Sequence, residues 1–209
     1  MRLPSYPNSF DTFIQDTVKT AKDNGIKIRL SAKKVVYADE HDKIGSSGYF
    51  SSEIPELAIA TKRKNPNDWL LLMIHESCHM DQFLENKVAW DRTMYSYQHF
   101  FDWIDGNNDL QEHEIQTAID DVIATELDCE RRSVEKIKRY GLPVDIEMYK
   151  KKANSYLYAI RFFGNCRRWL NDIYSDNDVW TIAPVNFKKK YDKIPSKLLR
   201  AYEIYAETH

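Results

Sequence analysis

Glycine and proline are scarce in this chain, and their scarcity limits which folds it can adopt. The 209 residues include six glycines and seven prolines, which is about half the share of a typical globular protein. A β-sandwich or β-barrel of short strands needs frequent turns, and these two residue types supply many of them. The sequence therefore predicts a fold dominated by helices.

The composition and charge are those of an ordinary globular domain. The formal net charge is -2, so no strong positive field favours nucleic acid or an anionic membrane. No apolar run approaches the roughly 18 residues that a membrane span needs, and the first residues lack the pattern of a secretory signal. The three cysteines lie far apart without CxxC spacing, which favours a reducing compartment. We therefore expect a cytoplasmic protein with no nucleic-acid or membrane partner.

The predicted elements begin with a helix and a small sheet and continue with helices. Strands are predicted at 26–30, 34–38 and 57–61, where apolar and β-branched residues lie between turn signals. The other segments have helical periodicity and capping signals, such as Asn65 and Pro66 at the start of the second helix. Helices are predicted at about 8–24, 66–86, 90–103, 109–140, 145–163 and 196–207. These elements predict the α+β class.

The sequence His75-Glu76-Ser77-Cys78-His79 has the HExxH pattern and lies in the middle of the second predicted helix. Residues four apart share a helix face, so His75 and His79 can bind one metal ion. Glu76 lies about 100° further round the helix. From there it can accept a proton from a water molecule beside the metal. The alternative interpretation is that two histidines share this spacing without binding a metal.

A hydrolytic zinc site needs a third protein ligand and an open position for water. On the predicted helix 109–140, Glu126 and Glu130 fall within about 20° of the centre of the apolar face. Buried carboxylates are costly unless they are paired or bound to metal. Glu126 as a metal ligand, and Glu130 hydrogen-bonded to a ligating imidazole, would account for both. The alternative is a buried ion pair with Arg161 or Arg167.

The HExxH sequence and the later segment 126–131 together resemble the gluzincin type of zinc metallopeptidase. Those enzymes carry HExxH on one helix and ExxxD on a later one. By this resemblance Glu126 is the third ligand of the zinc. Glu130 takes the place of the Asp that supports a ligating histidine, with a longer side chain.

The resemblance also implies a fold and a substrate. The implied fold is zincin-like, with a small N-terminal mixed sheet packed on a mostly helical body that includes the HExxH helix. We expect one such domain over 1–209, with its core at about 26–140 and a helical C-terminal extension at about 145–209. In zincins an edge strand runs beside the cleft, and 57–61 is expected to be that strand. A peptide or protein substrate would lie along it as an added strand.

Other residues are candidates for parts of the site. His99 or His113 could be the third ligand in place of Glu126. Cys78 and Cys129 could bind metal, although packing in the core is the simpler interpretation for both. The sequence does not choose the group that would stabilise an oxyanion. The candidates for that role are Tyr95, Tyr97, His99, Tyr156 and Arg161.

These features predict a zinc-dependent peptide-bond hydrolase in which Glu76 is the general base. Two neutral imidazoles and one carboxylate would leave the zinc site with a net positive charge, which favours an anionic intermediate. Two alternatives stay open. One is a zincin-like scaffold whose metal is structural and which serves as an interaction module. The other is a zinc hydrolase that cleaves an amide other than a peptide.

Overall fold

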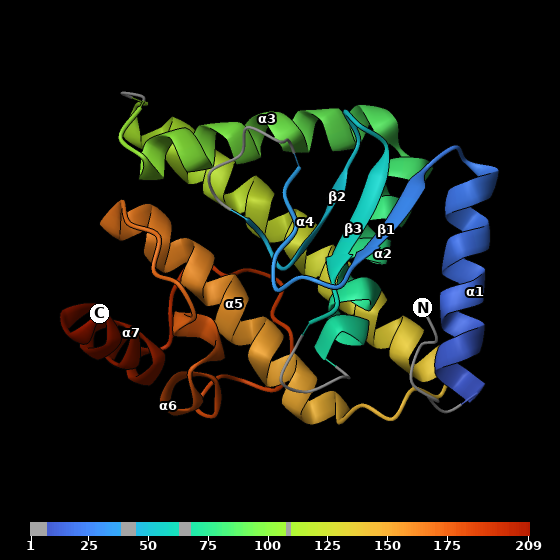
Figure 1. Ribbon diagram of the computed structural model, residues 1–209. Helices are drawn as coiled ribbons and strands as arrows, with labels where there is room; N and C mark the ends of the chain where they lie inside the picture. Colours follow the sequence, from blue (N-terminus) through green and yellow to red (C-terminus); the bar gives the residue numbers. More distant parts are fainter. Residues whose placement is uncertain (1–7, 39–44, 63–67, 108–109) are drawn as a thin grey trace. The chain divides into compact units, whose positions relative to one another are not determined.

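The computed structural model describes residues 8–38, 45–62, 68–107 and 110–209, which divide into two compact units (Figure 1). The N-terminal unit comprises Met1–Lys87 and Glu135–Pro143, and the C-terminal unit comprises Val88–Val134 and Val144–His209. The fold is α+β and mostly helical, as predicted. A single zincin-like domain over the whole chain stays a prediction.

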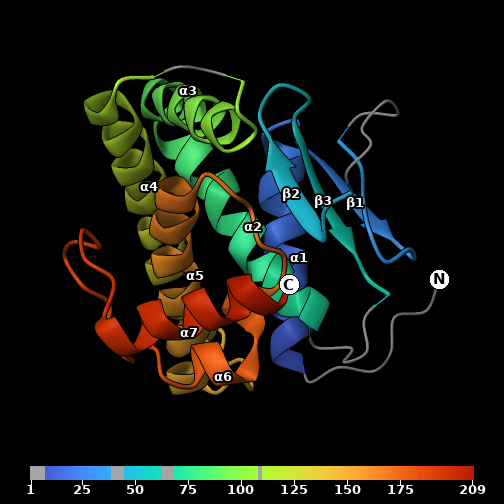
Figure 2. The ribbon, with the colours of Figure 1, turned by 90° about the vertical axis from the view of Figure 1, so that its left-hand side faces the viewer.

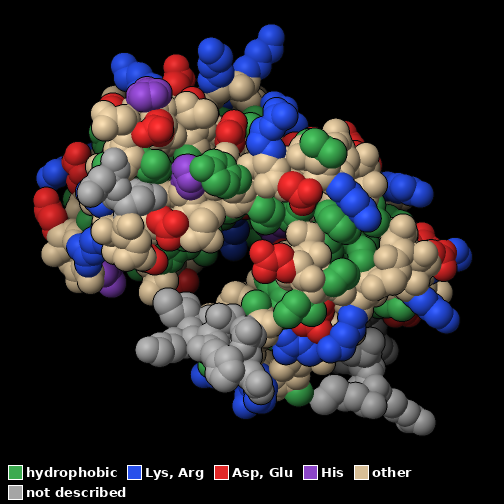
Figure 3. All heavy atoms as spheres, turned by 90° about the horizontal axis from the view of Figure 1, so that it is seen from above, with side chains coloured by type: hydrophobic (Ala, Val, Ile, Leu, Met, Phe, Trp, Pro, Cys, Tyr) green, Lys and Arg blue, Asp and Glu red, His purple; other side chains and the backbone are tan. Residues whose placement is uncertain are grey.

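The described residues form seven α-helices, one short 3-10 helix and three strands. In chain order these are α1 (Asn8–Asp23), β1 (Lys27–Ser31), β2 (Gly48–Ser51), β3 (Glu56–Ala60), α2 (Asp68–Glu85), α3 (Lys87–Ile104), α4 (Glu112–Arg139), α5 (Ile146–Cys166), η1 (Ile173–Ser175), α6 (Asn177–Trp180) and α7 (Ser196–Thr208). Among them, no helix is both long enough and apolar enough to cross a membrane. On the face seen in Figure 3, acidic and basic side chains are interspersed, in keeping with the small net charge.

The three strands of the N-terminal unit form a mixed sheet in the order β1-β3-β2 (Figure 1). β3 pairs in parallel with β1, where Lys27 lies opposite Glu56, and antiparallel with β2, where Gly48 lies opposite Ile59. The prediction that 57–61 is an edge strand is therefore wrong. All five residues of β3 are buried, and the four that follow Glu56 are apolar, which is typical of a central strand.

The strand predicted at 34–38 is also wrong in its extent. Only Val36 forms a β-bridge there, with Ser46 as its antiparallel partner. Val36 is 1% exposed and packs with Ala58 and Ala60 of β3. The segment 34–38 thus contributes one buried residue to the core, and its neighbours do not continue the ladder. The segment 39–44 lies outside the described residues.

The helices of the N-terminal unit pack against this sheet. α1 lies beside β1, and α2 packs on β2 and β3 (Figure 2). The predicted first helix is confirmed, and Gly25 follows it with φ +70°. That left-handed conformation suits glycine just past a helix end. The predicted start of α2 at Asn65 and Pro66 lies outside the described residues.

The C-terminal unit is built around α4 and α5, which lie side by side in Figures 1 and 2. Asp145 caps α5, because its side chain accepts a hydrogen bond of 3.0 Å from the backbone N–H of Met148. Gly164 of α5 lies so close to α4 that a Cβ atom there would collide with the Ile119 side chain. Apolar residues of α3, α4, α5 and α7 form one continuous core in this unit.

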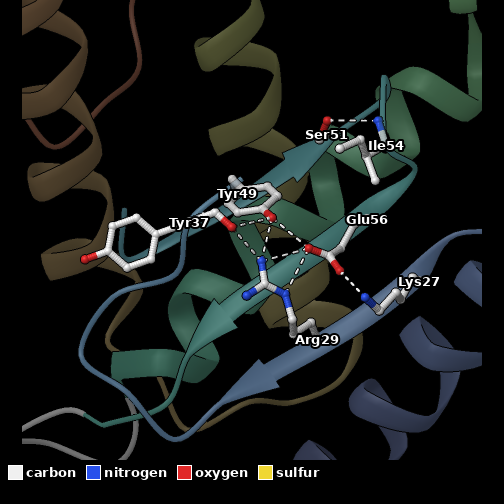
Figure 4. A network of polar contacts seen from close by, with 7 residues as sticks. All are labelled: Lys27, Arg29, Tyr37, Tyr49, Ser51, Ile54 and Glu56. Carbon is white, nitrogen blue, oxygen red and sulfur yellow. Dashed lines mark hydrogen bonds and ion pairs between the residues drawn. The ribbon is translucent and has the colours of Figure 1, made fainter. Parts of the chain in front are cut away.

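A polar network on the sheet surrounds Glu56, whose side chain is 7% exposed (Figure 4). The carboxylate accepts hydrogen bonds from Arg29 Nε at 3.0 Å and Tyr49 Oη at 2.7 Å, and it pairs with Lys27 Nζ at 2.9 Å. Burial alone would raise the pKa of Glu56. The three donors outweigh burial and lower this pKa to about 2.

The ionised Glu56 therefore stabilises the sheet in a pH-dependent way. An unfolded Glu has a pKa of about 4.3, so this stabilisation is complete above about pH 5 and is lost as the pH falls towards 2. We expect Glu56→Gln to lower the free energy of unfolding by about 2–3 kcal/mol at pH 7. Urea unfolding between pH 7 and pH 2 measures both effects. Asp23→Asn, which breaks an exposed pair with Lys19, is the control and should change little. An unaltered acid dependence in Glu56→Gln would contradict this account.

Candidate metal centre

The HExxH sequence lies on α2, a helix of the N-terminal unit whose middle is buried. Glu76 and His79 are each 8% exposed, and His75 is half-buried. The two imidazoles and the carboxylate therefore lie on a continuous helix, as the sequence predicted. Their helical spacing is what sets the direction of each side chain.

The face of α2 that carries His79 is turned towards β2. The Leu72 side chain fills the space at Gly48, because a Cβ atom there would lie 3.0 Å from Leu72 Cδ2. Eleven residues further along α2, the ring of Phe83 packs on Phe50 of β2 with 5.5 Å between ring centroids. At 100° per residue, His79 lies within about 20° of Leu72. The sheet contacts thus fix the rotation of the helix about its own axis.

The two imidazoles converge on each other through the same atom. The Nε2 atoms of His75 and His79 lie 3.1 Å apart, and the rings are nearly perpendicular at 84°. Two nitrogen ligands of a tetrahedral zinc, each about 2.0–2.1 Å from the ion, would lie about 3.3 Å apart. Two nitrogen lone pairs at this distance repel unless a proton or a cation lies between them. The pair therefore has the spacing of a two-histidine metal site.

Gln82 orients one of these imidazoles. Its Oε1 lies 2.9 Å from Nδ1 of His79. A carboxamide oxygen can only accept, so Nδ1 carries the hydrogen and Nε2 keeps the lone pair that a metal needs. This role of Gln82 was not predicted from the sequence. Its position three residues after His79 on the same helix was the signal that could have found it.

The two predicted carboxylates of α4 are buried in the structure. Glu126 is 4% exposed and Glu130 is 5% exposed. In the C-terminal unit, Tyr97 of α3 donates a hydrogen bond to Oε1 of Glu126, and Tyr149 of α5 donates to Oε2 of Glu130 at 2.6 Å. Burial first, and then the charge of the adjacent carboxylate, raise the pKa of both tyrosines well above the usual value. Both phenols therefore stay protonated as donors.

The alternative of an ion pair with Arg161 or Arg167 is wrong. Arg161 pairs with Asp120 and donates to Gln116 Oε1 at 2.8 Å. Arg167 donates to the backbone carbonyl of Trp103 at 3.1 Å. These contacts of Arg161 join α5 to α4 and already use its guanidinium. Arg161 is therefore a weaker candidate for stabilising an oxyanion.

Three described residues, His75, His79 and Cys129, make up a possible metal-binding group. Cys129 is fully buried and is not in a disulfide. Packing in the core was the simpler prediction for this cysteine, yet a thiolate is also a common zinc ligand. Cys129 lies three residues after Glu126 on α4, so the two share a helix face. The role of Glu126 as a ligand stays a prediction.

The remaining candidates have defined surroundings in the C-terminal unit. His113 is exposed near the start of α4, 13 residues before Glu126 and so about 20 Å away along the helix. The ring of His99 packs on exposed Tyr95 with 4.1 Å between centroids. Tyr156 packs edge-on against Tyr174 at 5.1 Å.

A cavity of about 220 Å³ in the N-terminal unit lies apart from the histidines. It is lined by α1, α2 and the end of α4, and its lining does not include His75, Glu76 or His79. Lys136 lines it, pairs with Asp81 at 2.7 Å and donates to Ser77 Oγ at 2.8 Å. These contacts hold the HExxH helix to the last turns of α4.

Comparison with known proteins finds no relative of this chain. No protein-family model matches it, and no curated protein and no solved structure matches it. The resemblance to gluzincins therefore stays a prediction that rests on the residues themselves.

We expect the histidine pair to be needed for one zinc ion per chain. His75→Ala and His79→Ala should each lose the zinc and lower the thermal stability, because metal binding stabilises the native state. Gln82→Leu should keep the site but weaken zinc binding by about 10–100-fold, since the tautomer of His79 is no longer fixed. Elemental analysis and chelator competition measure these effects. Equal zinc content in the wild type and both alanine variants would contradict the assignment.

Proposed function

We propose that this protein is a zinc-dependent peptide-bond hydrolase. The observation that carries the proposal is the 3.1 Å separation of the Nε2 atoms of His75 and His79, with Gln82 on the outer nitrogen of His79. Two imidazoles held in this way fit a tetrahedral zinc better than a chance pair on a helix would. Glu76, between them on the same helix, adds the group that hydrolysis requires.

The third ligand of the proposed site comes from α4. Glu126 is our choice, because a buried carboxylate held by a neutral donor keeps the negative charge that zinc attracts. Glu130, one turn further along α4, is the proposed supporting carboxylate. Cys129 is the alternative ligand.

The residues divide the chemistry between them. When bound, zinc supplies a Lewis acid and lowers the pKa of water at its open position to about 7. Glu76 would accept a proton from the water molecule that attacks the peptide carbonyl, and would then deliver it to the leaving amine. The low exposure of Glu76, 8%, limits competing solvent around this carboxylate.

The proposed peptide substrate needs an open strand edge, and the sheet order changes where that edge lies. β3 is paired on both sides, so a substrate cannot add to it. Within the described residues β2 pairs with β3 alone, and α2 packs on β2. A peptide would therefore pair with β2, 48–51, next to the helix that carries the histidines.

A second candidate function is a structural metal site in a binding module, and Cys129 favours it. Cysteine thiolates are common in closed structural zinc sites, in which four protein ligands leave no position for water. A site formed by both histidines, Cys129 and Glu126 would be closed in this sense. The two candidates therefore differ in whether α4 supplies one ligand or two.

The general-base role of Glu76 gives a direct test of hydrolysis. Glu76→Gln should keep the fold and the zinc but reduce cleavage of a peptide library by at least about 100-fold, since the proton acceptor is lost. Mass spectrometry of the digested library measures cleavage. Glu85→Gln is the matched control, because Glu85 is exposed on the same helix, and it should cleave as the wild type does. Undiminished cleavage by Glu76→Gln would exclude this mechanism, and no cleavage by zinc-loaded wild type would favour the structural site.

Variants of α4 separate the two ligand sets. Glu126→Ala should cost zinc affinity heavily, and Glu130→Ala should weaken it by about 10–100-fold without changing the number of ligands. If the site is hydrolytic, Cys129→Ser should change the zinc affinity little. If four protein ligands surround the zinc, Cys129→Ser should lower the zinc affinity as much as Glu126→Ala does. Asp128→Ala is the control, because it removes a half-exposed pair with Arg132 on the same helix. Chelator competition gives each affinity, and small effects from both Glu126→Ala and Glu130→Ala would place the third ligand elsewhere.

A further inference from the structure

Two buried carboxylates of α4 are each held by a tyrosine from a different helix. Tyr97 of α3 donates to Glu126 Oε1, and Tyr149 of α5 donates to Glu130 Oε2 at 2.6 Å. All four residues belong to the C-terminal unit. Glutamates one turn apart thus have separate partners, which fix each carboxylate independently.

The position of the Tyr97 hydroxyl is set by packing around its ring. Phe101, one turn later on α3, stacks on Tyr97 with 6.3 Å between centroids and 23° between planes. Phe101 in turn packs on Phe100 at 5.4 Å and on Trp169 at 5.8 Å. An aromatic group fixed in this way can hold a hydrogen-bond partner in one orientation at little entropic cost.

The choice of a phenol, and not a guanidinium, affects what Glu126 can do. A guanidinium would offset the negative charge of the carboxylate. A neutral hydroxyl orients the carboxylate and leaves that charge in place. Glu56, by contrast, forms ion pairs with Lys27 and Arg29, and no chemical role is proposed for it. A hydrogen bond from a fixed hydroxyl, such as the one from Tyr97 to Glu126, is a usual support for a carboxylate that binds a metal ion.

We propose that Tyr97 is a positioning residue for the metal ligand Glu126. Its hydroxyl fixes the rotation of the carboxylate group and thereby selects which oxygen coordinates the ion. This inference rests on the proposed function, because it requires Glu126 to be a ligand. Tyr149 holds Glu130 by a similar contact and, through a further hydrogen bond, contacts Ser133. It does not touch Glu126, so it provides an internal comparison.

The test compares Tyr97→Phe with Tyr149→Phe in the full chain. Each change removes one hydroxyl from one buried tyrosine–glutamate pair and keeps the ring. We expect Tyr97→Phe to weaken Zn²⁺ binding by about 10–100-fold, the usual size for losing such a contact. Tyr149→Phe should weaken it clearly less, because in the proposed site the carboxylate that Tyr149 holds supports a histidine and does not itself bind the ion. The absorption spectrum of the Co²⁺-loaded protein should change in Tyr97→Phe alone, because it reports the geometry of the ligands. Unfolding of both metal-free variants measures any effect on stability alone.

Each other outcome overturns the inference in a recognisable way. If Tyr97→Phe binds Zn²⁺ and Co²⁺ as the wild type does while Glu126→Ala does not, Tyr97 does not position the ligand, and the proposed site stands. If both tyrosine variants lose affinity only in proportion to their stability, the role of Tyr97 is structural. If Glu126→Ala keeps its zinc, Glu126 is not a ligand and the inference is wrong. Hydrolysis with another third ligand is then still tested by Glu76→Gln.

Discussion

The cost of burying charge is the constraint on which the rest of this structure depends. A buried carboxylate is destabilising by several kcal/mol unless donors or cations compensate it, and Glu56, Glu76, Glu126 and Glu130 are all less than 9% exposed. The chain compensates them in different ways. Cations from β1 surround Glu56 in the sheet, whereas neutral phenols hold Glu126 and Glu130 on α4. In each case the donors come from a neighbouring element, so the compensation also fixes the orientation of the carboxylate.

Long unbroken helices are what allow these groups to be arranged. Both four-residue spacings, His75 to His79 and Glu126 to Glu130, place side chains on one face only while the helix continues through them. α2 is fixed in rotation by β2, and α4 runs for 28 residues without a glycine or proline. The scarcity of those two residue types is thus a condition for the site as well as for the fold.

Most of the elements and the buried face of α4 could be predicted from the sequence, because helical periodicity is a local property. The helical wheel of α4 placed Glu126 and Glu130 at the centre of a buried stripe, and their burial is confirmed. The order of the sheet could not be predicted in the same way, because pairing joins segments that are distant in sequence. Tyr97 precedes Glu126 by 29 residues, and no local pattern pairs them. Gln82 is the exception, because its spacing from His79 is local.

Gly164 has a consequence for α4 that reaches beyond its own contact. The missing side chain lets α5 approach Ile119 of α4 closely. Tyr149 lies 15 residues earlier on α5, which is about 22 Å along the helix axis, and there it donates a hydrogen bond to Glu130 of α4. These two contacts lie towards opposite ends of one rigid rod. A methyl group at Gly164 would push this end of α5 away from α4 and change the angle between the two helices. At the other end, the hydrogen bond between Tyr149 and Glu130 tolerates a change in its length of only a few tenths of an ångström. A single hydrogen atom in place of a methyl group thus sets the alignment of a carboxylate about four helical turns away.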